Sequence, residues 1–189
     1  LALKSLDDGR RIKTYIREKN VRKVVIIGMG YIGLEMCEAF RARSIEVDMV
    51  KPGPVFMPWM ATELADRVRE EVLSNGVKLH SGHQVQKIES EGECLKVVCA
   101  DIALEADMVL VAMGIKPGSE FAAAAGIKTG ERDSIAVDRT LMTSNKNIYA
   151  AGDCADAYHV VTNAKTWIPL ALRANRAGWA VADNVCGKK

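Results

Sequence analysis

Three glycines that follow an apolar run carry the most specific chemical signal in this sequence. Gly28, Gly30 and Gly33 form the pattern G-x-G-x-x-G directly after the β-branched run 24–27. The first glycine of such a pattern allows a tight turn, the second lets the backbone approach a pyrophosphate, and the third lets a helix pack on a sheet. Unpaired N–H groups at the start of that helix would face the phosphates. We therefore predict a dinucleotide-binding turn; the alternative is an ordinary strand–turn–helix whose glycines only ease packing.

The elements that must position this turn can be read on both sides of it. We predict a strand over 21–28, whose apolar run is typical of a parallel strand covered on both faces. A helix over 31–43 and a second strand over 45–50 follow the glycines. Hydrophobic periodicity further predicts an amphipathic helix over 3–19, a helix over 62–74 with Thr62 as its N-cap, and a short strand over 77–80.

The pattern changes between residues 84 and 104. Short extended runs are broken there by the polar stretch 91–93, which favours an antiparallel meander over another helical crossover. The apolar run 107–112 then returns as a strand that ends at Gly114. We therefore expect an α/β fold, a parallel sheet whose last crossover is replaced by a β-meander.

The remaining two fifths of the chain has a weaker hydrophobic periodicity. A short helical stretch stops at Gly126, and strands are predicted over 135–137 and 147–151. The second of these strands runs into a Gly-Asp turn at 152–153. A last helix is predicted over 169–184, with a face of small apolar residues.

The composition limits the classes of protein to which this chain can belong. The 189 residues carry a net charge of +2, which gives no case for a nucleic acid or an anionic membrane as partner. No apolar run approaches the roughly 18 residues of a membrane span. Residues 1–20 are charged and helix-like, unlike a secretory signal.

The cysteines and histidines do not form a recognisable reactive set. Five scattered cysteines without a CxxC pair predict reduced thiols in a cytoplasmic protein and no metal site. Cys37 is expected to be buried, and Cys154, the one thiol inside a motif, to be a small apolar residue rather than a nucleophile. His80, His83 and His159 have no acid or serine partner at triad-like spacing, so no catalytic residue is predicted.

Three blocks in order resemble the pyridine nucleotide-disulfide oxidoreductase family of flavoprotein reductases. Residues 28–35 are similar to its GxGYIGxE motif, residues 112–117 to its ATGxxP bridge, and residues 143–153 to its second flavin motif. Residues 168–178 resemble the flavin-side helix of the coenzyme A-disulfide reductase and NADH oxidase/peroxidase branch. Three motifs in the right order are far more specific than one.

The resemblance implies a domain plan. It implies a Rossmann-like FAD/NAD(P)-binding fold with a linking helix over 1–20, an NAD(P)-binding domain over 21–116, and the C-terminal segment of a FAD-binding domain over 117–189. Family members begin with a FAD-binding half that has its own GxGxxG and a redox cysteine, and they end with a dimerisation domain. This sequence has one GxGxxG and no cysteine that matches. We expect an internal fragment whose partners are those missing parts of a homodimeric parent.

The resemblance also implies the cofactor contacts, with NAD(P) at the first motif and FAD at the later ones. The nicotinamide dinucleotide would be held by Gly28, Gly30, Tyr31, Ile32, Gly33, Glu35, Lys51 and Gly114, and the flavin by Gly152, Asp153, Pro169, Leu170 and Ala171. The last helix would aim its positive amino end at the pyrimidine edge of the flavin.

Two residues of the first motif have competing roles. In the family Tyr31 is a gate over the nicotinamide pocket, which we favour over simple packing because the residue lies within the phosphate turn. The family places Glu35 near the nicotinamide–flavin junction, with a lysine of the missing half as partner. A carboxylate near the start of a helix is also stabilised by the helix dipole alone, so both interpretations of Glu35 stay open.

Lys51 bears on the choice between NADH and NADPH. The residue that contacts the ribose lies at the end of the second strand, about 20 residues past the glycines, and is usually Asp or Glu in NAD enzymes. Lys51 stands there, and a cation favours the 2′-phosphate of NADP; the alternative is a solvated charge at a strand end. Asp48 lies within the strand and is expected to point elsewhere. We predict that NADPH binds at least as tightly as NADH.

These patterns favour part of a FAD-dependent NAD(P)H oxidoreductase that passes hydride from nicotinamide to flavin and on to a disulfide, peroxide or oxygen. The chain alone is expected to be inactive, and its electron acceptor is not identified by the sequence. One alternative is a non-catalytic NAD(P)-binding or sensing module. A weaker alternative is a single-cofactor Rossmann dehydrogenase.

Overall fold

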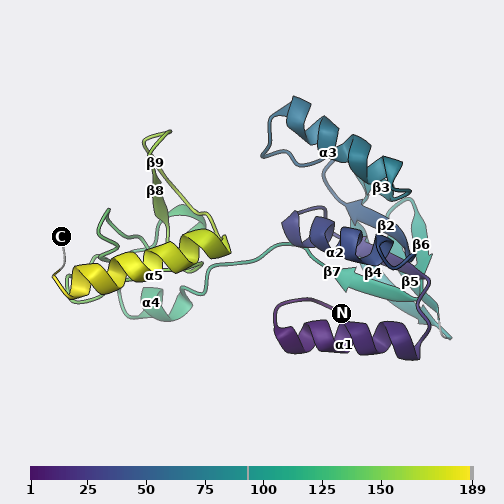
Figure 1. Ribbon diagram of the computed structural model, residues 1–189, viewed down its shortest axis with the longest axis horizontal. Coiled ribbons are helices and arrows are strands. Elements are labelled where there is room, and N and C mark those ends of the chain that lie inside the picture. Colours follow the sequence, from purple (N-terminus) through teal and green to yellow (C-terminus); the bar gives the residue numbers. More distant parts are fainter. Residues whose placement is uncertain (93, 188–189) are drawn as a thin grey trace. The chain divides into compact units, whose positions relative to one another are not determined.

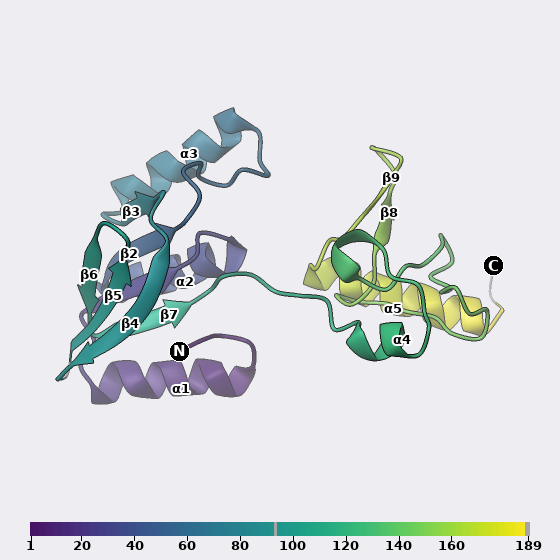
Figure 2. The same ribbon diagram turned by 180° about the vertical axis from the view of Figure 1, so that it is seen from behind.

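The computed structural model describes residues 1–92 and 94–187 and divides into two compact units, Leu1–Gly114 and Ile115–Lys189. Each unit has its own buried core, so each is described by itself. Figures 1 and 2 show the chain from opposite sides. Within the described residues no helix is long and apolar enough to cross a bilayer.

The first unit is built on a four-stranded parallel sheet. Its strands are β1 (Lys23–Ile27), β2 (Glu46–Lys51), β3 (Lys78–Ser81) and β7 (Met108–Val111), in the order β3-β2-β1-β7. Ile27 is in register with Val50 on one side and Val111 on the other. The chain runs outward from β1 to β3 and then returns to the other side of β1, so the order reverses between β1 and β7. The carboxyl ends of strands at such a reversal form the crevice where α/β sheets bind ligands.

Helices and a meander cover opposite faces of this sheet (Figures 1 and 2). One face packs against α1 (Leu6–Glu18), α2 (Tyr31–Arg41) and α3 (Thr62–Ser74). The other face packs against β4 (Val85–Glu91), β5 (Cys94–Cys99) and β6 (Ala103–Ala106). Both faces of β1 are therefore buried, which explains its unbroken apolar run. The predicted α/β fold with a meander crossover is confirmed.

Local capping moves several predicted boundaries. The helix predicted from residue 3 begins at Leu6, because Ser5 and Asp8 form a reciprocal capping box. The helix predicted to Arg43 ends at Arg41. The prediction of Thr62 as an N-cap is wrong: Ala61 is the N-cap of α3 and makes no side-chain capping bond.

The second unit has a small core and little regular structure. Its elements are α4 (Glu120–Ala124), a 3₁₀ turn η1 (Glu131–Asp133), the hairpin strands β8 (Ala157–His159) and β9 (Ala164–Thr166), and α5 (Ala171–Val185). The buried apolar residues are Ala122, Ile127, Ile135, Val137, Ala150 and Ala155.

The strands predicted over 135–137 and 147–151 are wrong, because their residues form only isolated bridges. In the first run a side-chain acceptor takes a backbone donor, since the Asp156 carboxylate accepts the N–H of Val137 at 3.1 Å. The Asp138 carboxylate accepts the N–H of Met142, the residue that bridges to Tyr149 of the second run, at 3.0 Å. The hairpin β8–β9 was not predicted. Of the small apolar face expected on the last helix only Ala177 is buried.

Candidate functional site

The glycine turn joins the carboxyl ends of two neighbouring strands. Gly28 has φ +114° and its N–H donates to the carbonyl of Val50 at 2.8 Å. A Cβ on Gly28 would stand closer to the carbonyl oxygen of Ala112 than the 3.0 Å that real Cβ atoms keep. Only glycine fits, because any side chain would collide with the backbone that leaves β7.

The other two glycines have different surroundings. A Cβ on Gly33 would lie 2.7 Å from the carbonyl oxygen of Gly28, so this glycine lets α2 pack directly on the turn. Gly30 is the N-cap of α2, has an ordinary φ of −90°, and has no neighbouring atom within 4 Å of its Cβ position. The space in front of Gly30 is therefore open, whereas the space at Gly28 and Gly33 is filled by the protein itself.

The open space faces the amino end of α2. The first N–H groups of a helix have no partner within the helix, and the helix dipole places partial positive charge there. Ile32 lies in this first turn and is 41% exposed. The end of β7 leads to the same edge of the sheet, since Ala112 N–H donates to Ile27 at 2.8 Å and Gly114 follows with φ +93°. This edge has the open backbone donors that a diphosphate requires.

Tyr31 is the first residue of α2, and its side chain is 54% exposed. Its hydroxyl oxygen accepts the indole N–H of Trp59 at 3.2 Å. The two rings meet edge to face, with centroids 5.9 Å apart. Trp59 belongs to the loop between β2 and α3, and no sequence motif pointed to it.

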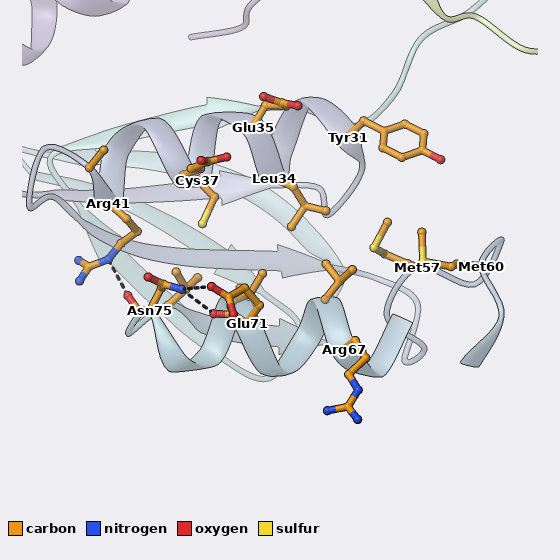
Figure 3. Close-up of a pocket in the computed structure, with 15 residues that line it drawn as sticks. Tyr31, Leu34, Glu35, Cys37, Arg41, Met57, Met60, Arg67, Glu71 and Asn75 are labelled. Atoms are coloured by element: carbon orange, nitrogen blue, oxygen red, sulfur yellow. Dashed lines mark hydrogen bonds between the residues drawn. The ribbon is translucent and has the colours of Figure 1, made fainter. Parts of the chain in front are cut away.

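A groove of about 860 Å³ runs between α2 and α3 (Figure 3). Figure 3 shows Tyr31, Met57 and Met60 at one end and Asn75 near the other, where Arg41 Nε donates to the Asn75 carbonyl at 2.9 Å. Glu35 lines the groove, and its carboxylate has no ion-pair partner in the part of the chain that the structure describes.

Cys37 also lines this groove but is buried. Burial raises the pKa of its thiol to about 11. The thiol is therefore neutral at physiological pH and is a packing residue, as the sequence predicted.

Lys51 ends β2 at the edge of the sheet that carries the glycine turn. Its Nζ donates to the carbonyl of Val55 at 2.5 Å, so its present partner is neutral. Asp48 points away, as predicted: it is buried on the meander face, with Lys23 Nζ at 3.0 Å and His80 Nε2 at 3.7 Å. The single cation at the end of β2 is Lys51, and no acid of this strand accompanies it there.

The later motif residues come together within the second unit. Gly152 has φ +92°, and its carbonyl accepts Arg173 Nη1 at 2.8 Å. The backbone carbonyl of Asp153 accepts the indole N–H of Trp167 at 2.7 Å, and the Asp153 residue is exposed. Pro169 precedes α5, Leu170 is its N-cap without a capping side chain, and Ala171 is its first residue. Arg173 therefore ties the Gly-Asp turn to the amino end of α5.

Sequence reasoning missed this role of Arg173. The guanidinium also donates to the carbonyls of Ala155 at 3.1 Å and Asp156 at 2.5 Å. The only signal was an arginine one turn into the last helix, which by itself is ordinary. Among residues 1–92 and 94–187, no group of His, Cys, Asp or Glu is arranged to hold a metal ion.

The parallel sheet, the glycine turn and the meander define an α/β protein of the Rossmann type. A family model described as pyridine nucleotide-disulphide oxidoreductase matches residues 2–178, and the chain belongs to this family. The predicted family is therefore confirmed.

Named relatives give the family a narrower context. The chain is 37% identical over 182 residues to an NAD(P)H coenzyme A polysulfide/persulfide reductase of Pyrococcus horikoshii, a match that covers 96% of this chain and 41% of the relative. It is 32% identical over 186 residues to an NADH oxidase of Methanocaldococcus jannaschii, covering 98% and 41%. The chain thus spans about two fifths of the length of these curated relatives.

Solved structures agree with this assignment. The chain superimposes on reduced CoADR-RHD of Bacillus anthracis with a TM-score of 0.91 at 36% identity, covering 100% of this chain and 34% of that one. A NAD-dependent persulfide reductase from A. fulgidus gives a TM-score of 0.91 at 34% identity, covering 100% and 35%.

Proposed function

We propose that this chain is the NAD(P)H-binding part of a FAD-dependent oxidoreductase. The observation that carries the proposal is the contrast among the three glycines. The space where a side chain of residue 28 or 33 would lie is occupied by the protein's own backbone. The corresponding space at Gly30, at the amino end of α2, is empty. This open space can admit a diphosphate, which a side chain at position 30 would block.

The proposed NAD(P) site uses the residues of one sheet edge. Backbone donors of Gly30, Tyr31, Ile32 and Gly33 would hold the diphosphate, and Lys51 would face the ribose 2′ position. Gly28 lets the backbone that leaves β7 approach closely, and Gly114, with φ +93°, places no side chain at this edge. The bound nucleotide supplies a hydride; the protein's part is to hold the ring in place and exclude water.

We further propose that residues 117–189 belong to the flavin side of the same enzyme. Support comes from the exposed Asp153 carboxylate and from the uncapped amino end of α5 after Pro169, which Arg173 holds together. Those groups suit the ribityl hydroxyls and the pyrimidine edge of a flavin. The names of the relatives, a polysulfide/persulfide reductase and an NADH oxidase, favour a polysulfide, a persulfide or oxygen as the final acceptor.

The test is calorimetric titration of the purified chain with NADPH and NADH. Gly30→Val is the informative variant, because its side chain enters open space with an ordinary φ and leaves the fold intact. We expect Gly30→Val to abolish binding while the circular dichroism spectrum is unchanged. Gly118→Val, at another glycine with open space, is the matched control and should bind as the parent does.

Two outcomes contradict the proposal. One is no uptake of either nucleotide at millimolar concentration; the other is unchanged affinity of Gly30→Val. A visible spectrum with and without added FAD tests the flavin part separately, since retained yellow colour after gel filtration would show a competent flavin surface.

A further inference from the structure

The Tyr31–Trp59 pair links the glycine turn to a loop far along the chain. Tyr31 begins α2, and Trp59 lies in the connection between β2 and α3. Their contact combines an indole N–H···O bond of 3.2 Å with an edge-to-face arrangement of the rings. Both side chains are more than half exposed, so the pair is not held by burial in the core.

Trp59 is the fixed member of the pair. The neighbouring side chains Phe56 and Met57 are buried in the helix-side core. Met57 has φ +46°, a left-handed conformation that costs a methionine energy, and Met60 N–H closes a turn onto the Met57 carbonyl at 3.0 Å. Lys51 ties the start of the same loop to Val55. Strained backbone of this kind persists only where surrounding contacts enforce it, and here it presents Trp59 to Tyr31.

Tyr31 is the adjustable member. As the first residue of a helix, with a ring on a two-torsion side chain, it can turn either toward the loop or over the backbone donors beside Gly30. The indole bond holds it toward the loop, and the space in front of Gly30 is open.

We propose that Trp59 is a positioning residue of the dinucleotide site: its indole N–H holds the Tyr31 ring against the loop and keeps it from folding over the glycine turn. The proposal rests on the proposed function, because it concerns the same site. A ring held aside in the free protein does not have to be displaced by the incoming nucleotide, so the affinity is higher.

The hydrogen bond itself is tested without nucleotide. The chain has three tryptophans and therefore three indole N–H signals in a ¹H–¹⁵N spectrum. Trp59→Phe identifies one of them by its loss. We expect Tyr31→Phe to shift that signal alone and to speed its exchange with water, because its acceptor is gone. No shift on Tyr31→Phe would overturn the proposal.

The effect on binding is tested by calorimetry with NADPH. Trp59→Phe keeps an aromatic ring but removes the donor. From the net free energy of a hydrogen bond between uncharged groups, we expect it to weaken NADPH binding about threefold to tenfold. Tyr31→Phe should weaken it similarly, and the double variant should be no weaker than either single variant. Trp179→Phe, at an exposed tryptophan of α5, is the control and should bind as the parent does.

Each result separates the two proposals. If the unsubstituted chain binds NADPH but Trp59→Phe binds equally well, or if the two single losses add in the double variant, this inference is overturned and the proposed function stands. If the unsubstituted chain binds no dinucleotide, both are overturned.

Discussion

Gly28 and Ala112 lie against each other at the point where the strand order of the sheet reverses. The carbonyl oxygen of Ala112 fills the space that a side chain on Gly28 would need, and Gly28 adopts φ +114°. The contact joins the exit of β1 to the exit of β7, two strands separated by most of the first unit. One backbone contact therefore fixes the edge on which the proposed site depends.

Gly28→Ala should destabilise the chain strongly. The substitution combines a left-handed backbone with a clash against an immobile carbonyl, and together these predict a loss of about 2–5 kcal/mol. Gly82→Ala separates the two effects, because Gly82 has φ +90° but no atom within 4 Å of its Cβ position. It should lose only about 1–2 kcal/mol. Urea unfolding of both variants measures the difference, and equal losses would mean that the Ala112 contact contributes nothing.

The first unit could be predicted well because its signals are local and redundant. An apolar run with glycines at fixed spacing allows few folds, and the meander was visible from its polar break. The predicted helix boundaries were wrong where a helix cap sets them. The capping box of Ser5 and Asp8 shortens α1, and Ala61 rather than Thr62 is the N-cap of α3. Such failures shift an element by a few residues and leave the fold unchanged.

The second unit was predicted less well, for a physical reason. The runs 135–137 and 147–151 have strand-like composition, but the carboxylates of Asp138 and Asp156 take up backbone donors that a ladder would use. The Val137–Asp156 bond joins residues 19 positions apart and leaves no periodic trace in the sequence. The same holds for Trp59 and Arg173, whose partners lie 28 and 17–21 positions away in the sequence; only the folded structure reveals them.

Lys51 should matter to NADPH and not to NADH. Its ammonium now bonds a neutral carbonyl, which a 2′-phosphate can outcompete through a charge-assisted bond. Lys51→Ala is expected to weaken NADPH binding about tenfold or more and to leave NADH binding unchanged. The affinity of the unsubstituted chain for NADPH should also fall more steeply with added salt than the affinity of Lys51→Ala does. A clear preference for NADH that Lys51→Ala does not alter would contradict the prediction.

Cysteine labelling should follow burial and pKa. Burial raises the pKa of Cys37 to about 11 and also raises the pKa of Cys99, whereas Cys186 is exposed. At pH 7.5 a maleimide reagent should label Cys186 first and leave Cys37 and Cys99 unmodified until denaturant is added. Mass spectrometry of the labelled peptides measures this order.

The raised pKa of Cys37 also predicts how stability changes in alkali. The folded chain holds the Cys37 proton more tightly than the unfolded chain, whose thiol has the ordinary value of 9.0. This contribution is fully present below pH 9 and is lost as the pH rises toward about 11. Cys37→Ala removes the titrating group, so its unfolding free energy should fall less steeply over that range than that of the parent.

Arg173 should carry much of the stability of the second unit. Its guanidinium donates to three backbone carbonyls, those of Gly152, Ala155 and Asp156. Arg173→Met leaves these acceptors without the charged donor and should cost about 3 kcal/mol. Arg173→Lys keeps the charge but not the planar fork, so it should restore only part of the loss.

Arg176→Met, on an exposed position of the same helix, is the matched control and should change stability by less than about 0.5 kcal/mol. Thermal unfolding of the three variants provides the measurement, and an Arg173→Met variant as stable as Arg176→Met would show that the three bonds do not hold the Gly-Asp turn to α5.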